Sequence, residues 1–91
     1  MVAVVDEANI LQGIFTDGDL RRLLEKNIAI NVPISEVMSK NVKGLAYKQN
    51  LAADALVLMQ QKKINGIIVI DEARHPLGAF NLHDLMAAGI I

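Results

Sequence analysis

The 91-residue sequence contains no cysteine, no tryptophan and only three aromatic residues, which are Phe15, Tyr47 and Phe80. Without cysteine the chain forms no disulfide, no thiolate nucleophile and no cysteine-based zinc site. The formal net charge of -1 gives no long-range attraction to nucleic acid or to an anionic membrane. The longest apolar runs, such as Ile67 to Ile70, are far shorter than the roughly 20 residues that span a bilayer. The N-terminus also lacks the basic and apolar segments of a signal peptide, so we expect a cytoplasmic protein with no nucleic-acid or membrane partner.

Hydrophobic residues make up 53% of the sequence and charged residues 21%, which is typical of a globular protein rather than a disordered one. The length corresponds to about one small domain. A chain this short buries only about two-thirds of the surface that it exposes when unfolded, so a partner chain would stabilise it. Because aromatic residues are scarce, we expect a core of Ile, Leu, Val, Ala and Met.

An apolar run that leads through a sharp polar turn into a helix start occurs twice. The two stretches are Gly13-Ile14-Phe15-Thr16-Asp17-Gly18-Asp19-Leu20 and Gly78-Ala79-Phe80-Asn81-Leu82-His83-Asp84-Leu85. In each, the apolar run ends at a Thr or Asn, and an Asp follows three residues later. The open backbone N–H groups at such a helix start form a natural anion site. Two such starts in one small domain predict a paired ligand-binding module.

Hydrophobic periodicity predicts the remaining elements. We expect strands at 1–5 and 10–15, a helix after Thr16, one helical turn at 35–38, a strand at 41–46, a helix at 51–63, strands at 67–70 and 77–80, and a helix at 82–88. The Val-rich run at 1–5 has the composition of a strand that is buried on both faces. Gly13, inside the second strand, indicates a bulge or a close approach of another backbone segment.

Capping residues predict where the first two helices begin and end. We expect Thr16 to cap the first helix, with Asp19 completing a short-armed capping box, and the helix to end near Asn27. Asn50 is the expected N-cap of the helix at 51–63, and Asn65-Gly66 is the expected stop.

Shifting the sequence by 65 residues aligns its two halves without an insertion. Val4 then falls on Val69, Gly13 on Gly78, Phe15 on Phe80 and Asp19 on Asp84. Two strand–turn–strand–helix units of this kind imply stacking by pseudo-twofold symmetry. The second unit also has an upstream strand and helix, at 41–63, which the first unit lacks. We therefore expect the chain to begin inside its first repeat, with one side of that sheet covered by an upstream segment or by another chain, most simply in a homodimer.

These features resemble a CBS-domain pair, also called a Bateman module, whose signature is Gly-hydrophobic-x-Thr/Ser-x-x-Asp/Asn. Residues 13–19 fit this signature fully, whereas the second copy has Asn81 where Thr or Ser is expected. The resemblance implies an α/β (α+β) fold of tandem repeats, each a small sheet packed by helices. Its expected divisions are a partial first repeat at 1–30, a connector at 31–40 and a second repeat at 41–91.

Three stretches, at 13–22, 34–38 and 82–91, are similar to the C-terminal region of the arabinose-5-phosphate isomerase family. That family joins an N-terminal sugar-isomerase domain to a C-terminal CBS pair. It interconverts ribulose 5-phosphate and arabinose 5-phosphate for Kdo and lipopolysaccharide synthesis in Gram-negative bacteria. The resemblance implies that the catalytic sugar-isomerase domain is a partner outside these residues, and that this fragment alone does not catalyse the reaction.

The helix starts and the resemblance together predict a ligand-binding set: Thr16, Asp17, Asp19, Arg22, Asn81, His83 and Asp84. In this interpretation the Thr16 hydroxyl and free N–H groups hold a phosphate, while Asp19 accepts hydrogen bonds from two ribose hydroxyls. Arg22 would clamp a phosphate or carboxylate, and His83 would contact a ligand or partner. The alternative is that the Thr, Asn and Asp residues only cap their own helices, and that Arg22 and His83 are solvated.

The sequence offers no candidate catalytic or metal-binding set. Ser35 and Ser39 lie in the connector without a nearby His, and His75 and His83 are not at a recognised metal-ligand spacing, so we expect no cofactor. The leading hypothesis is a regulatory module that binds a nucleotide or nucleotide-sugar, with CMP-Kdo favoured as the pathway end product, and modulates the attached isomerase. The alternatives are an AMP or ATP sensor, and an assembly module that dimerises the enzyme and binds no ligand.

Overall fold

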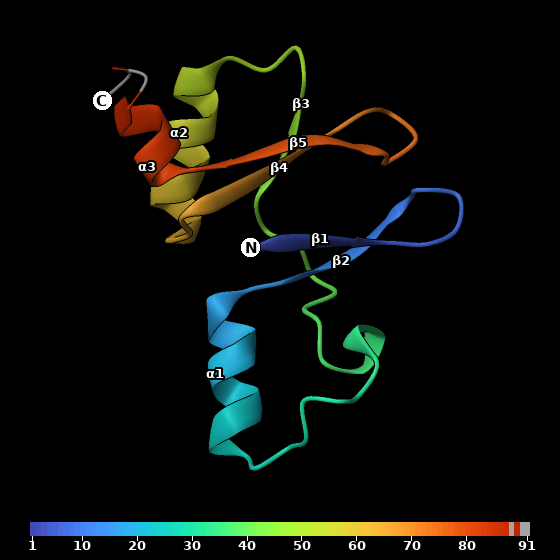
Figure 1. The fold of residues 1–91 in the computed structure, drawn as a ribbon. Helices are drawn as coiled ribbons and strands as arrows, with labels where there is room; N and C mark the ends of the chain where they lie inside the picture. The colour runs from blue at the N-terminus through green and yellow to red at the C-terminus, as the bar shows by residue number, and fades with distance from the viewer. Residues whose placement is uncertain (88, 90–91) are drawn as a thin grey trace. The chain divides into compact units, whose positions relative to one another are not determined.

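The computed structural model describes residues 1–87 and residue 89 (Figure 1). The elements are β1 (Val2–Val5), β2 (Leu11–Phe15), α1 (Asp17–Glu25), the short 3-10 helix η1 (Ile34–Glu36), β3 (Leu45–Tyr47), α2 (Ala52–Lys62), β4 (Gly66–Ile70), β5 (Pro76–Asn81) and α3 (Leu82–Ala87). The described residues thus form a mixed α+β fold with a two-stranded and a three-stranded sheet. The chain divides into two compact units, Met1–Val42 and Lys43–Ile91.

In the first unit, β1 and β2 form an antiparallel hairpin that pairs Val2 with Phe15. Asp6 closes its turn, because its Oδ1 accepts hydrogen bonds from the N–H groups of Ala8 (2.9 Å) and Ile10 (3.0 Å). The register shifts between Val4 and Val5, which is the mark of a β-bulge.

The hairpin of the second unit repeats these details at the same 65-residue offset. Asp71 Oδ1 accepts from the N–H groups of Ala73 (3.0 Å) and His75 (2.8 Å), and the register shifts between Val69 and Ile70. The internal repeat expected from the sequence is therefore confirmed in the hydrogen bonds of its turns as well as in its strands.

The expectation that residues 1–5 form a strand buried on both faces is wrong. Val2 is 56% exposed, whereas its counterpart Ile67 in the second unit is 0% exposed. Ile67 lies in a cluster with Ala46 of β3 and with Ala55 and Met59 of α2, and residues 1–42 contain no equivalent of β3 or α2. An apolar composition alone does not reveal whether a covering helix is present.

The connector returns to the sheet of the first unit. Ile14 and Ser39 exchange two backbone hydrogen bonds, of 2.9 and 2.8 Å. A Cβ on Gly13 would lie 2.6 Å from the Ser39 carbonyl oxygen, so the predicted close backbone approach at this glycine is confirmed. The helical turn expected at 35–38 is observed one residue earlier, as η1.

The second unit has the complete order of strand, helix, strand, strand and helix. β3 runs parallel to β4, and β4 runs antiparallel to β5. α2 packs Ala55 and Met59 against Ala46 and Ile67, and the partly buried Leu82 packs against the same cluster. Ile68 and Ile70 are also buried, as expected for the wholly apolar run at 67–70. The predicted strand at 41–46 exists but is shorter and later, at 45–47.

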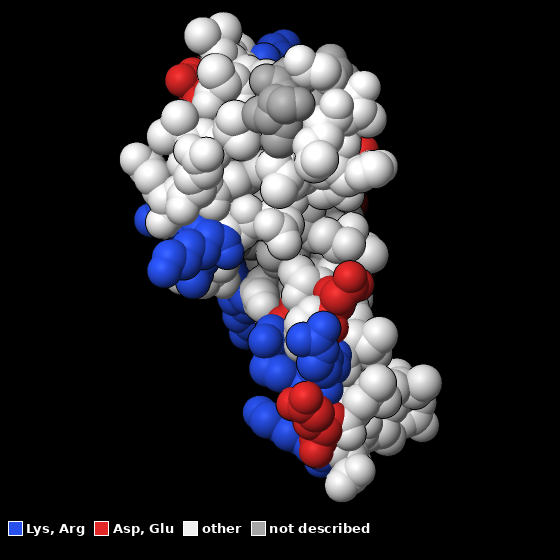
Figure 2. Space-filling model, turned by 90° about the vertical axis from the view of Figure 1, so that its left-hand side faces the viewer, with Lys and Arg blue, Asp and Glu red and all other residues white. Residues whose placement is uncertain are grey.

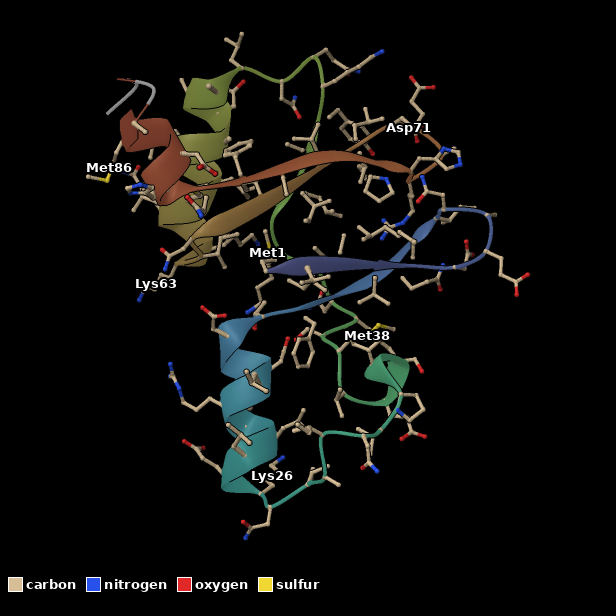
Figure 3. All side chains as sticks on the ribbon, in the orientation of Figure 1. Met1, Lys26, Met38, Lys63, Asp71 and Met86 are labelled. Atoms are coloured by element: carbon tan, nitrogen blue, oxygen red, sulfur yellow. The ribbon has the colours of Figure 1, made fainter. Side chains whose placement is uncertain are left out.

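Both predicted ends of the helix at 51–63 need correction. Asn50 is not its N-cap: Asn50 Oδ1 accepts from the Tyr47 N–H (2.7 Å), and Leu51 occupies the N-cap position. The helix ends at Lys62, and Lys63, labelled in Figure 3, adopts the left-handed conformation with φ 55°, two residues before Asn65.

α3 ends at Ala87, and the Ala88 of the predicted helix 82–88 lies outside the described residues. Within the described part of the chain, no helix is long and apolar enough to cross a membrane.

Candidate functional site

The start of α1 carries the capping box that its spacing predicts. The Asp19 N–H donates to Thr16 Oγ1 (3.1 Å), and Asp19 Oδ2 accepts from the Thr16 N–H (2.8 Å). Asp19 Oδ2 also accepts from the Thr16 hydroxyl (3.0 Å). Because that hydroxyl has one proton, which it donates to Asp19 here, only its oxygen is left to accept a hydrogen bond from another group in this arrangement.

Two further side chains complete the surroundings of Asp19. Asp19 Oδ1 accepts from Ser39 Oγ (2.8 Å) and from Arg22 Nη2, with which it also forms an ion pair. The carboxylate therefore accepts four hydrogen bonds from its own chain, which is about its full capacity. Its side chain is only 4% exposed, whereas that of Arg22 is 59% exposed.

Electrostatics in this cluster favour the ionised form of Asp19. Burial alone raises its pKa, but the hydrogen bonds from Ser39, the Thr16 N–H, Arg22 and the Thr16 hydroxyl outweigh that effect. The pKa of Asp19 therefore lies below its ordinary value of 3.8. The cluster thus contains a buried carboxylate that is hydrogen-bonded and paired with Arg22.

The start of α3 has the same box but is far more open. The Asp84 N–H donates to Asn81 Oδ1 (2.9 Å), and Asp84 Oδ2 accepts from the Asn81 N–H (2.8 Å). Asn81 and Asp84 are both exposed. Within the described residues, Asp84 Oδ1 and the Asn81 side-chain NH2 group have no further partner. Asn81 thus caps with its oxygen and leaves two donors available, which a Thr at this position would not do.

The other predicted residues take simpler positions. Asp17 is exposed at the first position of α1, and His83 is exposed in the first turn of α3. The seven candidates thus form two groups, each within its own unit: Thr16, Asp17, Asp19 and Arg22 in the first, and Asn81, His83 and Asp84 in the second.

Ser39 is the member of the first group that the sequence did not reveal. It lies 20 residues from Asp19, so no local spacing indicates the contact. The signal that came nearest was Gly13, whose lack of a side chain lets the Ser39 backbone approach β2.

The surface charge is mixed. Figure 2 shows Lys and Arg side chains next to Asp and Glu side chains on the face that it presents. Among the described residues, no group of three or more His, Cys, Asp or Glu side chains is arranged to hold a metal ion.

The sequence is similar to known proteins over its whole length. The CBS domain model matches residues 34–90. Arabinose 5-phosphate isomerase KdsD of Pseudomonas aeruginosa and arabinose 5-phosphate isomerase GutQ of Salmonella typhi are each 45% identical to the whole of this chain. The chain spans 28% of the length of each of these relatives. The similarity to this isomerase family that the sequence indicated is therefore confirmed for the region present.

The fold has matching solved structures as well. The CBS domain pair of protein MJ0100, in complex with 5′-methylthioadenosine and S-adenosyl-L-methionine, matches with a TM-score of 0.82 and 28% identity, over 96% of this chain and 67% of that one. The family model covers well over half of the sequence, and the structural match extends through both repeats. This chain belongs to the CBS domain family.

Proposed function

We propose that this chain is the regulatory region of an arabinose 5-phosphate isomerase, and that it binds a nucleotide or nucleotide-sugar which alters the activity of the attached sugar-isomerase domain. The observation that carries the proposal is the 45% identity, over the full chain, to arabinose 5-phosphate isomerases that are more than three times as long. In this proposal the isomerisation belongs to the rest of the longer protein, and the site of action is the cytoplasm.

The capping box of the second repeat has open groups of the kind that such an effector needs. A ribose diol requires acceptors such as Asp84 Oδ1, and a phosphate requires donors such as the Asn81 amide and the N–H groups at a helix start. The MJ0100 CBS pair, whose ligands both contain an adenosyl group, supports a nucleoside as the recognised part. CMP-Kdo is favoured because it is the end product of the pathway to which the isomerase family belongs, and AMP and ATP are the alternatives.

Isothermal titration calorimetry with CMP-Kdo, CMP, AMP, ATP and S-adenosyl-L-methionine tests the binding step. Wild-type chain should bind at least one of them, and Asp84→Ala should weaken that binding about tenfold or more, because a carboxylate-to-hydroxyl hydrogen bond is charge-assisted. Asp54→Ala is the matched control: Asp54 caps α2 in the same way, through the Leu51 N–H (3.3 Å), but lies outside the candidate set. Absence of heat from every ligand would refute effector binding.

Regulation is tested in the full-length isomerase. The effector identified by calorimetry should change the rate of ribulose 5-phosphate interconversion, and the Asp84→Ala enzyme should keep its basal rate while losing the response. Equal rates with and without saturating effector would contradict the regulatory role.

A second candidate function is assembly of the enzyme as a homodimer. The specific observation in its favour is that several large apolar side chains of the first unit are exposed, among them Val2 at 56%, Leu24 at 59% and Ile30 at 71%. Sedimentation equilibrium should show a concentration-dependent dimer, and Leu24→Glu should shift it toward monomer. A monomer at all accessible concentrations would remove this candidate.

A further inference from the structure

The carboxylate of Asp19 is enclosed by donors from its own chain, and Arg22 is the most exposed of them. Thr16 and Ser39 are half-buried, whereas the Arg22 side chain is 59% exposed. The guanidinium lies across the first turn of α1: a Cβ on Gly18 would be 3.5 Å from Arg22 Nη1 and 3.6 Å from Thr16 Oγ1. Arg22 is therefore the donor around Asp19 that is most accessible to a group from solvent.

The second repeat shows the same box without such a guanidinium. The counterpart of Arg22 at the 65-residue offset is Ala87, and the counterpart of Asp19 is Asp84. Asp84 makes the same backbone contact with its cap residue, 2.8 Å in both repeats, yet it is exposed while Asp19 is 5% exposed. The two repeats therefore present the same aspartate in two states, one covered by an arginine and one open.

We infer that Arg22 is an internal competitor for the Asp19 carboxylate, which excludes uncharged ribose diols from the first repeat. The inference rests on the proposed function, since it concerns the effector site of this module. A neutral hydroxyl would have to replace a charge-assisted hydrogen bond and an ion pair with an ordinary hydrogen bond, which is unfavourable. A ligand that also carries a phosphate can engage the displaced guanidinium and recover part of that loss.

Arg22 thereby acts as a specificity determinant. It disfavours nucleosides such as 5′-methylthioadenosine at the first repeat, and it penalises nucleotides such as AMP less. The second repeat, with Ala87, does not make this distinction.

The test is calorimetric titration of the 91-residue chain with 5′-methylthioadenosine and with AMP. Arg22→Met removes the charge and the donors but keeps an unbranched apolar stem over the helix. It should strengthen 5′-methylthioadenosine binding about tenfold, or create it where wild type shows none, and should strengthen AMP binding less. Arg21→Met is the control, because Arg21 is an exposed neighbour of the same charge that makes no hydrogen bond to Asp19. Arg22→Ala serves as a second variant, and thermal denaturation verifies that each variant is folded.

The outcomes separate this inference from the proposed function. Unchanged or weaker 5′-methylthioadenosine binding by both Arg22 variants would overturn the inference, even where wild type binds a nucleotide. An equal increase in affinity for 5′-methylthioadenosine and AMP would also overturn it. Relief of a purely structural constraint would raise the affinity for both ligands by the same factor. If the wild-type chain binds no nucleotide at all, the proposed function is contradicted. If the Arg22 variants alone then bind 5′-methylthioadenosine, that result still supports the inference.

Discussion

Equivalent positions in the two hairpin turns have similar backbone conformations but different residues. Asn9 and Arg74 occupy equivalent turn positions and both have left-handed backbones, with φ of 62° and 69°. Asn tolerates this conformation because its short polar side chain can hydrogen-bond locally, whereas Arg has no such compensation. The side chain of Arg74 is exposed. The second turn is therefore strained at a position where the first is not.

Replacing Arg74 with glycine should stabilise the protein. Arg74→Gly removes the left-handed strain, which exceeds the extra entropy of glycine in the unfolded chain, for a net gain of about 0.5–1 kcal/mol in unfolding free energy. Urea denaturation measures the change. Asn9→Gly is the control and should give a smaller gain or a loss; a larger gain at Asn9 than at Arg74 would contradict the argument.

The Asp19 cluster predicts a pH dependence of stability. The pKa of Asp19 in the folded state is lowered below 3.8. Its ionised form therefore makes its full contribution to the free energy of unfolding well above pH 3.8, and this contribution is lost as the pH falls through the pKa of the folded state. Ser39→Ala removes one of the hydrogen bonds that lower the pKa, so it should cost about 1 kcal/mol at neutral pH. That cost should shrink at a pH below the folded pKa, where wild type has also lost the charge.

Denaturation curves at neutral and acidic pH check this prediction. Ser35→Ala is the control, since Ser35 is exposed in η1 and has no side-chain hydrogen bond among the described residues. A Ser39→Ala cost that stays the same at both pH values would show that the Asp19 charge is not involved. Replacing Asp19 itself would leave four donors without their acceptor, because its carboxylate accepts all four of these hydrogen bonds.

At the scale of elements, the equivalent glycines of β2 and β5 have different surroundings. A Cβ on Gly13 would lie 2.6 Å from the Ser39 carbonyl oxygen and 2.9 Å from Met38 Sδ, whereas a Cβ on Gly78 would have nothing within 4 Å. The connector packs against β2 and leaves no space there. The contact makes Gly13 necessary to the strand and leaves Gly78 replaceable.

Alanine substitutions at these two glycines should therefore have opposite effects. Gly13→Ala should destabilise the chain by about 1–3 kcal/mol through overpacking against backbone. Gly78→Ala should be neutral or stabilising by up to about 1 kcal/mol, because it restricts the unfolded chain. Thermal or urea denaturation measures both. Equal losses at the two positions would show that the close approach of the connector is not what constrains Gly13.

Elements with strong local signals were predictable from the sequence. The capping box at Thr16 and Asp19 and the apolar run of β4 follow from short-range chemistry alone. The ends of α2 could not be predicted in this way. The side-chain oxygen of Asn50 accepts a hydrogen bond from the Tyr47 N–H instead of capping the helix, and Lys63 adopts a left-handed conformation that usually requires Gly or Asn. In both cases the surrounding chain overrides a residue's usual preference.

At the scale of the whole molecule, the buried apolar side chains among the residues whose burial the structure describes are unevenly divided between the two units. The first unit contributes Leu11 and Leu23, and the second contributes Ala46, Ala55, Met59, Ile67, Ile68 and Ile70. Because burial of apolar surface is the main stabilising term, local opening should be easier in the first unit. The second unit should therefore hold its structure longer under native conditions.

Hydrogen exchange measured by mass spectrometry tests this difference. Amides of β4 should exchange more slowly than those of β1 and β2, after correction for intrinsic rates, because opening β4 exposes three fully buried isoleucines. Slower exchange in β1 than in β4 would contradict the prediction. An effector that binds the first repeat should slow exchange in β1 and β2 and so reduce the difference in exchange rate from β4, since binding stabilises the folded form.

The sequence by itself determined the class of fold, the internal repeat, the two capping boxes and the similarity to CBS domains, because each depends on residues within a few positions of one another or on a constant offset. Only the tertiary structure decided that Asp19 is enclosed while Asp84 is open. That difference depends on Ser39, twenty residues away, and on the orientation of the Arg22 side chain. The Ser39 contact forms only when the chain folds back on itself, and no local spacing encodes it, whereas Arg22 lies three residues from Asp19 on the same helix.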